Sequence, residues 1–353
     1  MSAVFSRKGG SDMASVTGKI PSILRRREWL LAALVLLVFF IFNAQQPNNY
    51  TFPKLLNQTR VYMVDVGFMA LGILLVLILG DIDISIAAIA ALSATVMAVT
   101  YNAGNGLPFE VSLALMLLVG AACGAVNGLL VTRFKELFPM IITLATQTLF
   151  RGIAYIILKD QSAGSFPAWF AKDLGYGSVP LFGLDVPYML LCLLAFIPFY
   201  HLWLHHTVSG RQLFAAGTNL TASRYSGLRT DRIKLTAFIL NGLFAAVGGL
   251  FLCSRTGSVK YTIGAGFEMQ AIAVAVLGGA STSGGKGSVI GLLLALLLLT
   301  VLKNGLMLLY NDAFILNLSV GLLLILVVLI PNILGMINSR RRVLRQRLQL
   351  IKP

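Results

Sequence analysis

Val276-Leu-Gly-Gly-Ala-Ser-Thr-Ser-Gly-Gly-Lys-Gly-Ser-Val-Ile-Gly291 separates two strongly apolar segments with a run rich in glycine and serine. Its lysine, Lys286, is the residue type that phosphate-binding loops use, and such a loop requires glycine, four residues and then Gly-Lys-Ser/Thr. Here the first glycine position is Ala280, and the residue after Lys286 is Gly287. The spacing therefore excludes a P-loop, and any ATP-driven work requires a second protein.

The composition of the chain is that of a membrane protein. At 57% hydrophobic and 12% charged residues, with a mean hydropathy of +0.84, it has more apolar surface than a soluble domain of 353 residues can bury. Only helices and closed barrels satisfy every backbone group in hydrocarbon, and long unbroken apolar runs favour helices. We therefore predict an all-α integral membrane protein.

Hydropathy and helix-breaking residues predict about ten transmembrane helices, some of them short or broken, with both termini in the cytoplasm. The predicted spans are 29–45, 61–79, 84–101, 109–131, 139–158, 186–205, 233–253, 267–280, 287–309 and 313–337. The span 267–280 is short enough to be a half-helix. In this topology Lys and Arg concentrate on the cytoplasmic side. This bias explains most of the net charge of +15 without a nucleic-acid partner.

The predicted organisation has three parts: a basic N-terminal tail at 1–28, a transmembrane permease domain at 29–337, and a basic C-terminal tail at 338–353. The N-terminus lacks a signal-peptide layout, because no small-residue cleavage site follows its first apolar stretch. The basic C-terminal tail is expected to contact anionic lipid headgroups. The cysteines are isolated in apolar segments, which indicates neither a disulfide framework nor a metal site.

The longest predicted cytoplasmic loop runs over about 205–234. Within it, Thr218 or Asn219 can cap a short helix that extends through Tyr225 and ends at Gly227. Small residues allow another backbone to approach closely. Two interpretations stay open on these grounds: a rigid lever that transmits a partner's motion, or a solvated connector.

Polar residues at membrane depth are costly and are therefore functional candidates. The candidates for a translocation pathway are Asp81, Asp83, Ser85, Asn127, Thr143, Gln147 and Glu268. Each has a structural alternative. Asp83 and Ser85 can cap the helix that follows them, Glu268 can stabilise a helix N-terminus, and the others can hydrogen-bond neighbouring helices.

Two helices carry small residues in a similar pattern, at 120–128 and 241–249, which predicts close helix–helix packing. Their similarity, together with the Gly/Ser-rich breaks at 80–85 and 278–288, suggests two related halves. His201, His205 and His206 cluster at the end of the sixth span and invite a proton-relay or metal role. No carboxylate stands beside them in the sequence, so interfacial placement is the simpler interpretation.

Several motifs occur in a characteristic order. They are Gly80-Asp-Ile-Asp-Ile-Ser85, Thr143-Leu with Arg151-Gly152, Ala216-Gly-Thr-Asn219 with Ala222 and Gly227, Gly266-Phe-Glu268, Leu277–Gly287 and Lys303-Asn-Gly-Leu306. With them the chain resembles the membrane permeases of bacterial ABC importers for ribose, xylose, arabinose, rhamnose and autoinducer-2. It departs from the family pattern at Asp81, where a second glycine is usual, and at Met140, where alanine is usual. These departures bear on substrate choice.

The resemblance implies a multi-pass protein of the bacterial inner membrane that is not itself an enzyme. Its expected partners are ABC ATPase subunits, which bind ATP-Mg, a second permease, alike or homologous, and a periplasmic or lipid-anchored sugar-binding protein. The chain itself would bind no cofactor. The residues that would seat the ATPase in the loop are Gly210, Arg211, Ala216, Gly217, Asn219, Ala222 and Gly227.

The expected function is a translocation pathway for a monosaccharide or a sugar-like signal that a binding protein delivers. Uptake of branched-chain amino acids or nucleosides is the alternative within the same superfamily. A self-sufficient secondary transporter is the alternative from another class, and the absence of a paired intramembrane acid–base network argues against it.

Overall fold

The computed structural model describes residues 27–102 and 106–312, with a few further positions between 314 and 329. In this part of the chain nearly all regular structure is helical, and the strands form two short two-stranded sheets. This agrees with the predicted all-α membrane fold. Most of the last predicted span, 313–337, and the two basic tails lie outside the described residues, except that Arg27 and Glu28 of the predicted N-terminal tail are described and begin the first helix.

Six described helices are long and apolar enough to cross a membrane. They are α1 (Arg27–Gln45), α5 (Phe109–Arg133), α6 (Pro139–Leu158), α7 (Tyr188–His206), α10 (Thr230–Thr256) and α12 (Val289–Tyr310). A seventh candidate is the pair α2 (Phe52–Tyr62) and α3 (Val64–Ile78), bent by 57°. Two apolar helices are shorter, α4 (Ile86–Asn102) and α11 (Phe267–Leu277). The predicted count of ten is therefore not established, although α11 has the predicted half-helix length.

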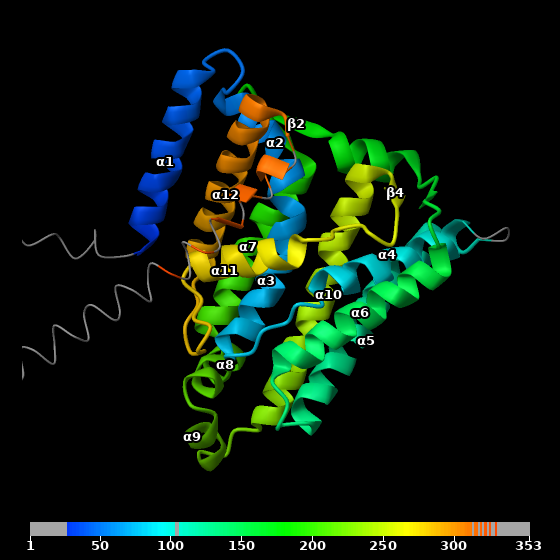
Figure 1. The fold of residues 1–353 in the computed structure, drawn as a ribbon, viewed down its shortest axis with the longest axis vertical. Helices are drawn as coiled ribbons and strands as arrows, with labels where there is room; N and C mark the ends of the chain where they lie inside the picture. Colours follow the sequence, from blue (N-terminus) through cyan, green and yellow to red (C-terminus); the bar gives the residue numbers. More distant parts are fainter. Residues whose placement is uncertain are drawn as a thin grey trace, which may run out of the picture.

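Helix α3 is the centre of the molecule. All of its residues are buried, and α10, α11, α7 and α12 pack around it (Figure 1). Its sequence has no polar face, as expected of a helix surrounded on all sides by protein. The core of the protein therefore follows α3, while α5, α6 and α7 expose many large apolar side chains.

Helices α5 and α10 cross at very short distance because their contact surfaces lack side chains. A Cβ atom on Gly124 would lie 2.2 Å from the carbonyl oxygen of Phe238. A Cβ atom on Gly242 would lie 2.2 Å from the carbonyl oxygen of Gly120. These contacts confirm the packing predicted for the two small-residue segments.

The chain breaks after α3 and after α11 are built alike. Gly80 (φ +81°) follows α3, and Gly279 (φ +104°) follows α11. Beyond each glycine a backbone N–H returns to the helix: Asp81 donates to Val76 O at 3.1 Å, and Ala280 donates to Ala275 O at 2.9 Å. This is the Schellman arrangement, in which a left-handed glycine ends the helix. The two breaks therefore begin with the same local geometry.

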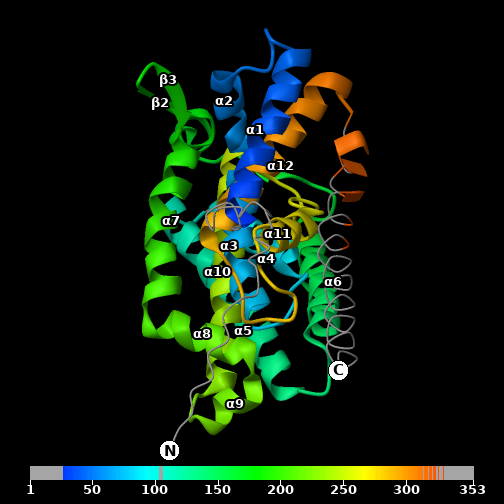
Figure 2. The ribbon, with the colours of Figure 1, turned by 90° about the vertical axis from the view of Figure 1, so that its left-hand side faces the viewer.

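The two ends of the molecule differ. One end carries η1 (Trp169–Leu174), a π-helix, and two small sheets; β1 (Ala163–Gly164) pairs with β4 (Ser258–Val259), and β2 (Ser178–Leu181) pairs with β3 (Leu184–Pro187). The other end carries α8 (Val208–Thr218) and α9 (Leu220–Tyr225), at the bottom of Figures 1 and 2. The N-terminal end of α1 lies toward the α8 end. There Ser288 Oγ, at the start of α12, donates a hydrogen bond to Glu28 Oε1 at 2.8 Å.

Candidate functional site

The predicted short helix of the long loop is present as α9. Asn219 caps it, accepting a hydrogen bond from Ala222 N at 2.9 Å, and Gly227 (φ +85°) follows its end. Before it, α8 begins at a Thr207 cap, whose side chain accepts from Gly210 N at 3.3 Å. The loop is therefore two capped helices joined at Asn219 rather than an extended connector.

Helix α8 ends against both chain breaks, at what we call the glycine junction: Gly80, Gly217, Gly284 and Gly285. Gly285 N donates to Ile78 O at 2.8 Å, which joins the second break to the end of α3. A Cβ atom on Gly217 would lie 1.7 Å from Ile78 O and 2.9 Å from Gly285 N. Only glycine fits at 217, so three backbone segments that are distant in sequence meet without intervening side chains.

The residues predicted to seat an ATPase divide into two groups. Gly210, Ala216 and Gly217 face their own chain: a Cβ atom on Gly210 would lie 1.9 Å from Leu204 O, and Ala216 is buried. Arg211, Asn219, Ala222 and Gly227 are exposed. Tyr225 of α9 is 90% exposed. The surface available to a partner is therefore mainly that of α9, while the last turn of α8 contacts the breaks.

Ion pairs attach α9 to the neighbouring helices. Asp231, in the first turn of α10, pairs with Arg224 at 2.6 Å and with Lys135 at 2.8 Å. Arg224 Nε also donates to Thr230 Oγ1 at 2.9 Å. Half-exposed pairs of this kind contribute little stability. Their geometry nevertheless links α9, α10 and the α5–α6 loop into one surface.

A second cluster, which we call the Asp83 network, lies within the break between α3 and α4. Asp83 Oδ1 accepts from Ser85 N at 2.8 Å and from Ser85 Oγ at 2.7 Å. Its Oδ2 accepts from Asn241 Nδ2 of α10 at 2.8 Å, and Asn127 Nδ2 of α5 donates to Ser85 Oγ at 2.7 Å. All four side chains are fully buried. The network joins α5 and α10 to the break and gives the carboxylate the partners that a buried charge requires.

Two further candidates contact the same break. Thr143 Oγ1 of α6 accepts from Ile84 N and donates to Ile82 O, each at 3.2 Å. Asp81 pairs with Lys234 of α10 at 2.8 Å, and both side chains are mostly buried. Among the predicted pathway residues, the structure therefore gathers Asp81, Asp83, Ser85, Asn127 and Thr143 around one irregular segment.

Gln147 and Glu268 lie apart from that cluster. Glu268 accepts from Gly266 N through both of its oxygens, at 3.1 and 3.2 Å, at the N-terminus of α11. Gln147 Nε2 lies 3.5 Å from Glu268 Oε1. The geometry at Glu268 is that of the helix-terminus alternative, since a carboxylate is favourable at the first turn.

Some buried polar residues of the structure were not among the predicted site residues. Asn241 completes the Asp83 network, and Lys234 pairs with Asp81. Toward the opposite end, Asp65 pairs with Arg255 at 2.9 Å, and Lys303 Nζ donates to Gln270 Oε1 at 2.5 Å. The expected absence of paired acid–base groups among the spanning helices is therefore wrong, and it no longer argues against a secondary transporter. The sequence criterion applied to Asp83, a polar side chain within an apolar segment, would also have identified these residues.

The helices that can span a membrane, the irregular segment buried among them and the loop helix joined to it are those of a polytopic membrane protein. Residues 55–331 match the family described as "Branched-chain amino acid transport system / permease component". The chain belongs to this family, so it is a permease, a transport component rather than a catalytic one. This confirms the resemblance drawn from the motifs.

Relatives cover nearly the whole chain. It is 35% identical over 317 residues to "Autoinducer 2 import system permease protein LsrD" of Yersinia pestis (strain Pestoides F) and to the protein of the same name of Yersinia pseudotuberculosis serotype O:3 (strain YPIII). Each alignment covers 87% of this chain and 92% of the relative. No solved structure matches the chain.

Proposed function

We propose that this chain forms the translocation pathway of an ATP-powered importer in the bacterial inner membrane, together with a second permease. Separate ATPase subunits dock on the α8–α9 end, and a binding protein delivers the solute at the opposite end. Both termini lie in the cytoplasm, and the remaining predicted spans complete a ten-helix domain over 29–337. The basic segments 1–28 and 338–353 are cytoplasmic tails.

The observation that carries this proposal is the glycine junction. An importer whose ATPase is a separate subunit needs a rigid element that reaches from the surface to the membrane-embedded helices. Helix α9 offers an exposed surface, and it is joined at Asn219 to the last turn of α8, where Gly217 contacts both the end of α3 and the 278–288 break. A displacement of α9 is therefore expected to move the two breaks together.

Transport proceeds by alternating access in this proposal. ATP binding closes the ATPase subunits, α9 moves with them, and the helices around α3 rearrange to open the pathway to one side or the other. A solute shifts such an equilibrium only through different affinities for the two states. Specificity is then determined mostly by the binding protein, while Gln147, which is only partly buried, is the candidate for contact with the solute.

For the solute we propose a sugar-like signal of the autoinducer-2 class. The support is the similarity to the autoinducer 2 import permeases of Yersinia, in an alignment that is 35% identical and covers 92% of each relative. Uptake of branched-chain amino acids is the alternative, which the family description favours.

The test is to purify the tagged chain from its native membrane and identify the proteins that accompany it. We expect a stoichiometric ATPase and a second permease, and ATP-dependent uptake in vesicles. The Gly217→Trp variant is expected to insert normally, yet to lose uptake. Gly152→Trp is the matched control, because nothing lies within 4 Å of the corresponding Cβ position. A chain that transports without ATP, or a Gly217→Trp variant with normal uptake, contradicts the proposal.

A further inference from the structure

A cavity of about 430 Å³ lies between the loop helix α8, the first turns of α10 and the adjoining ends of α3 and α7. Sites for small molecules measure about 300–1,000 Å³. The cavity is separate from the glycine junction and from the Asp83 network, because it shares no residue with either. Its position is at the boundary between the spanning helices and the loop.

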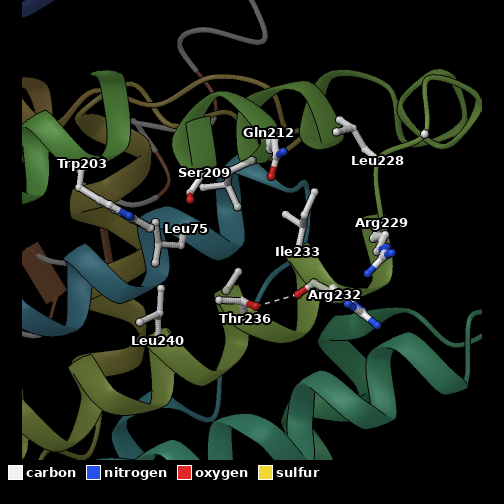
Figure 3. Close-up of a pocket in the computed structure, with 13 residues that line it drawn as sticks. Leu75, Trp203, Ser209, Gln212, Leu228, Arg229, Arg232, Ile233, Thr236 and Leu240 are labelled. Atoms are coloured by element: carbon white, nitrogen blue, oxygen red, sulfur yellow. Dashed lines mark hydrogen bonds between the residues drawn. The ribbon is translucent and has the colours of Figure 1, made fainter. Parts of the chain in front are cut away.

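The lining of the cavity is apolar at one end and cationic at the other. Figure 3 shows Leu75, Trp203 and Leu240 on the left, and Arg229 and Arg232 on the right. Ser209, Gln212 and Thr236 lie between the two ends. From Arg229 to Leu240 the chain advances about 16 Å along α10 at 1.5 Å per residue, toward the middle of the spanning helix.

The two arginines have their positive charge available. The carboxylate between them, Asp231, is engaged by Arg224 and Lys135. Neither Arg229 nor Arg232 forms a salt bridge with another residue that the structure describes. Both side chains are exposed at the mouth of the cavity. A ligand with an anionic group would therefore meet guanidinium groups that no described carboxylate neutralises.

We infer that this cavity binds an anionic phospholipid, with its phosphate at Arg229 and Arg232 and the first part of an acyl chain along Trp203, Leu75 and Leu240. Basic pockets between transmembrane helices on the cytoplasmic side suit such headgroups, and this is the cytoplasmic leaflet in the orientation proposed above. A zwitterionic lipid gains less from the arginines, because its own headgroup cation offsets the charge of its phosphate, and a soluble anion gains nothing from the apolar end. The lipid also fixes the spacing between α8 and α10, so it acts on the element that contacts the breaks.

Tryptophan quenching by brominated lipids tests the inference in the full-length chain. Trp203 becomes the sole tryptophan when Trp29 and Trp169 are replaced by phenylalanine. The chain is reconstituted in bilayers of fixed phosphatidylglycerol and phosphatidylcholine content, with bromine placed on one lipid or on the other. We expect brominated phosphatidylglycerol to quench Trp203 more strongly than its bulk share predicts. Equal quenching by the two lipids overturns the inference.

Charge variants distinguish a specific lipid site in the cavity from general attraction of anionic lipids to the basic surface of the protein. Arg229→Gln and Arg232→Gln are each expected to lower the preference for phosphatidylglycerol by about fivefold, the ratio for about 1 kcal/mol per basic residue at an anionic lipid surface. Arg133→Gln is the matched control, an exposed arginine at the same end of the molecule. A preference that survives in both variants, or falls equally in the control, contradicts the assignment.

Two further measurements distinguish a bound phospholipid from a soluble anion as the ligand of the cavity. Inorganic phosphate at constant ionic strength should not displace the lipid; full displacement would identify a soluble anion as the ligand. Native mass spectrometry of the chain with all of its tryptophans should retain phosphatidylglycerol, and retain less of it in the Arg229→Gln/Arg232→Gln variant. None of these readouts requires ATP, solute or a partner, so failure here leaves the proposed transport function standing.

Discussion

Asp83 shows how a single carboxylate can hold an irregular segment inside a membrane protein. Backbone that is neither helix nor barrel is tolerated at membrane depth only where protein or a water-filled cavity surrounds it. The residues around Asp83 meet this condition, because Asp83, Ile84, Ser85 and Ile86 are all buried. The carboxylate accepts from the backbone of Ser85 and from the Asn241 side chain of α10, so it replaces contacts that a continuous helix would have supplied.

Replacing Asp83 should therefore destabilise the fold in a graded manner. Asp83→Ala leaves the Ser85 N–H and the Asn241 amide without their acceptor, and an unsatisfied buried group costs about 1–3 kcal/mol. Asp83→Asn should cost less, because its oxygen can keep the Ser85 bonds while the Asn241 amide reorients. Thermal unfolding in detergent measures both variants. Asp185→Ala, at an exposed position of β3, is the control and should leave the midpoint unchanged. An Asp83→Ala variant as stable as this control would show that Asp83 does not stabilise the irregular segment.

At the scale of elements, the arrangement depends on how closely helices can approach. Helices α5 and α10 meet through Gly120, Gly124 and Gly242, and α8 meets the breaks through Gly217. The first contact keeps the bundle together, and the second joins the loop to it. The two should respond differently to a small added side chain, which gives two separate predictions.

A valine at Gly124 should weaken the fold. The Cβ atom alone would lie 2.2 Å from Phe238 O, so α5 and α10 would have to move apart. Such overpacking costs about 1–3 kcal/mol. Ala122→Val is the matched control on the same helix, at an exposed position. We expect a lower unfolding midpoint and a lower membrane yield for Gly124→Val alone; equal behaviour of the two variants would show that α5 and α10 are not tightly packed.

An alanine at Gly217 should impair transport more than stability. Its methyl group would lie 1.7 Å from Ile78 O, which forces the end of α8 away from the breaks. A strain of about 1–3 kcal/mol shifts a two-state equilibrium by about 5- to 150-fold. We expect uptake in vesicles to fall within that range while membrane insertion stays near wild type. Gly152→Ala, in open space on α6, serves as the reference and should transport normally.

The elements themselves were largely predictable, and their contacts were not. Glycine at 80 and at 279, asparagine at 219 and the small residues near 124 are local signals, and each helix end or close approach predicted from them is present. The meeting of the two breaks with α8 depends on segments far apart in the sequence, and no periodicity encodes such a distance. For the same reason Asn241 was recognised only as part of a small-residue helix, not as the partner of Asp83.

For the whole molecule, the question is which end faces the cytoplasm. The prediction rested on an excess of Lys and Arg on one side. Among the described residues the α8 end and the opposite end carry similar numbers of Lys and Arg, so the excess comes from the two tails. The described structure adds a difference in the chemistry of the two end surfaces. The α8 end presents an exposed helix anchored by ion pairs, and the opposite end presents a β-hairpin and clustered aromatic rings.

Cysteine labelling at two exposed positions decides the orientation. Phe182, in the β2–β3 turn, is 102% exposed, and Tyr225 of α9 is 90% exposed. Cys192→Ala provides the background, because Cys123 and Cys253 are buried. A membrane-impermeant maleimide should label the Phe182→Cys variant in intact spheroplasts and the Tyr225→Cys variant only after permeabilisation. The reverse pattern would put α8 and α9 outside, away from ATP. No cytoplasmic ATPase could then act through the glycine junction, and the contact between α8 and the breaks would serve the fold alone.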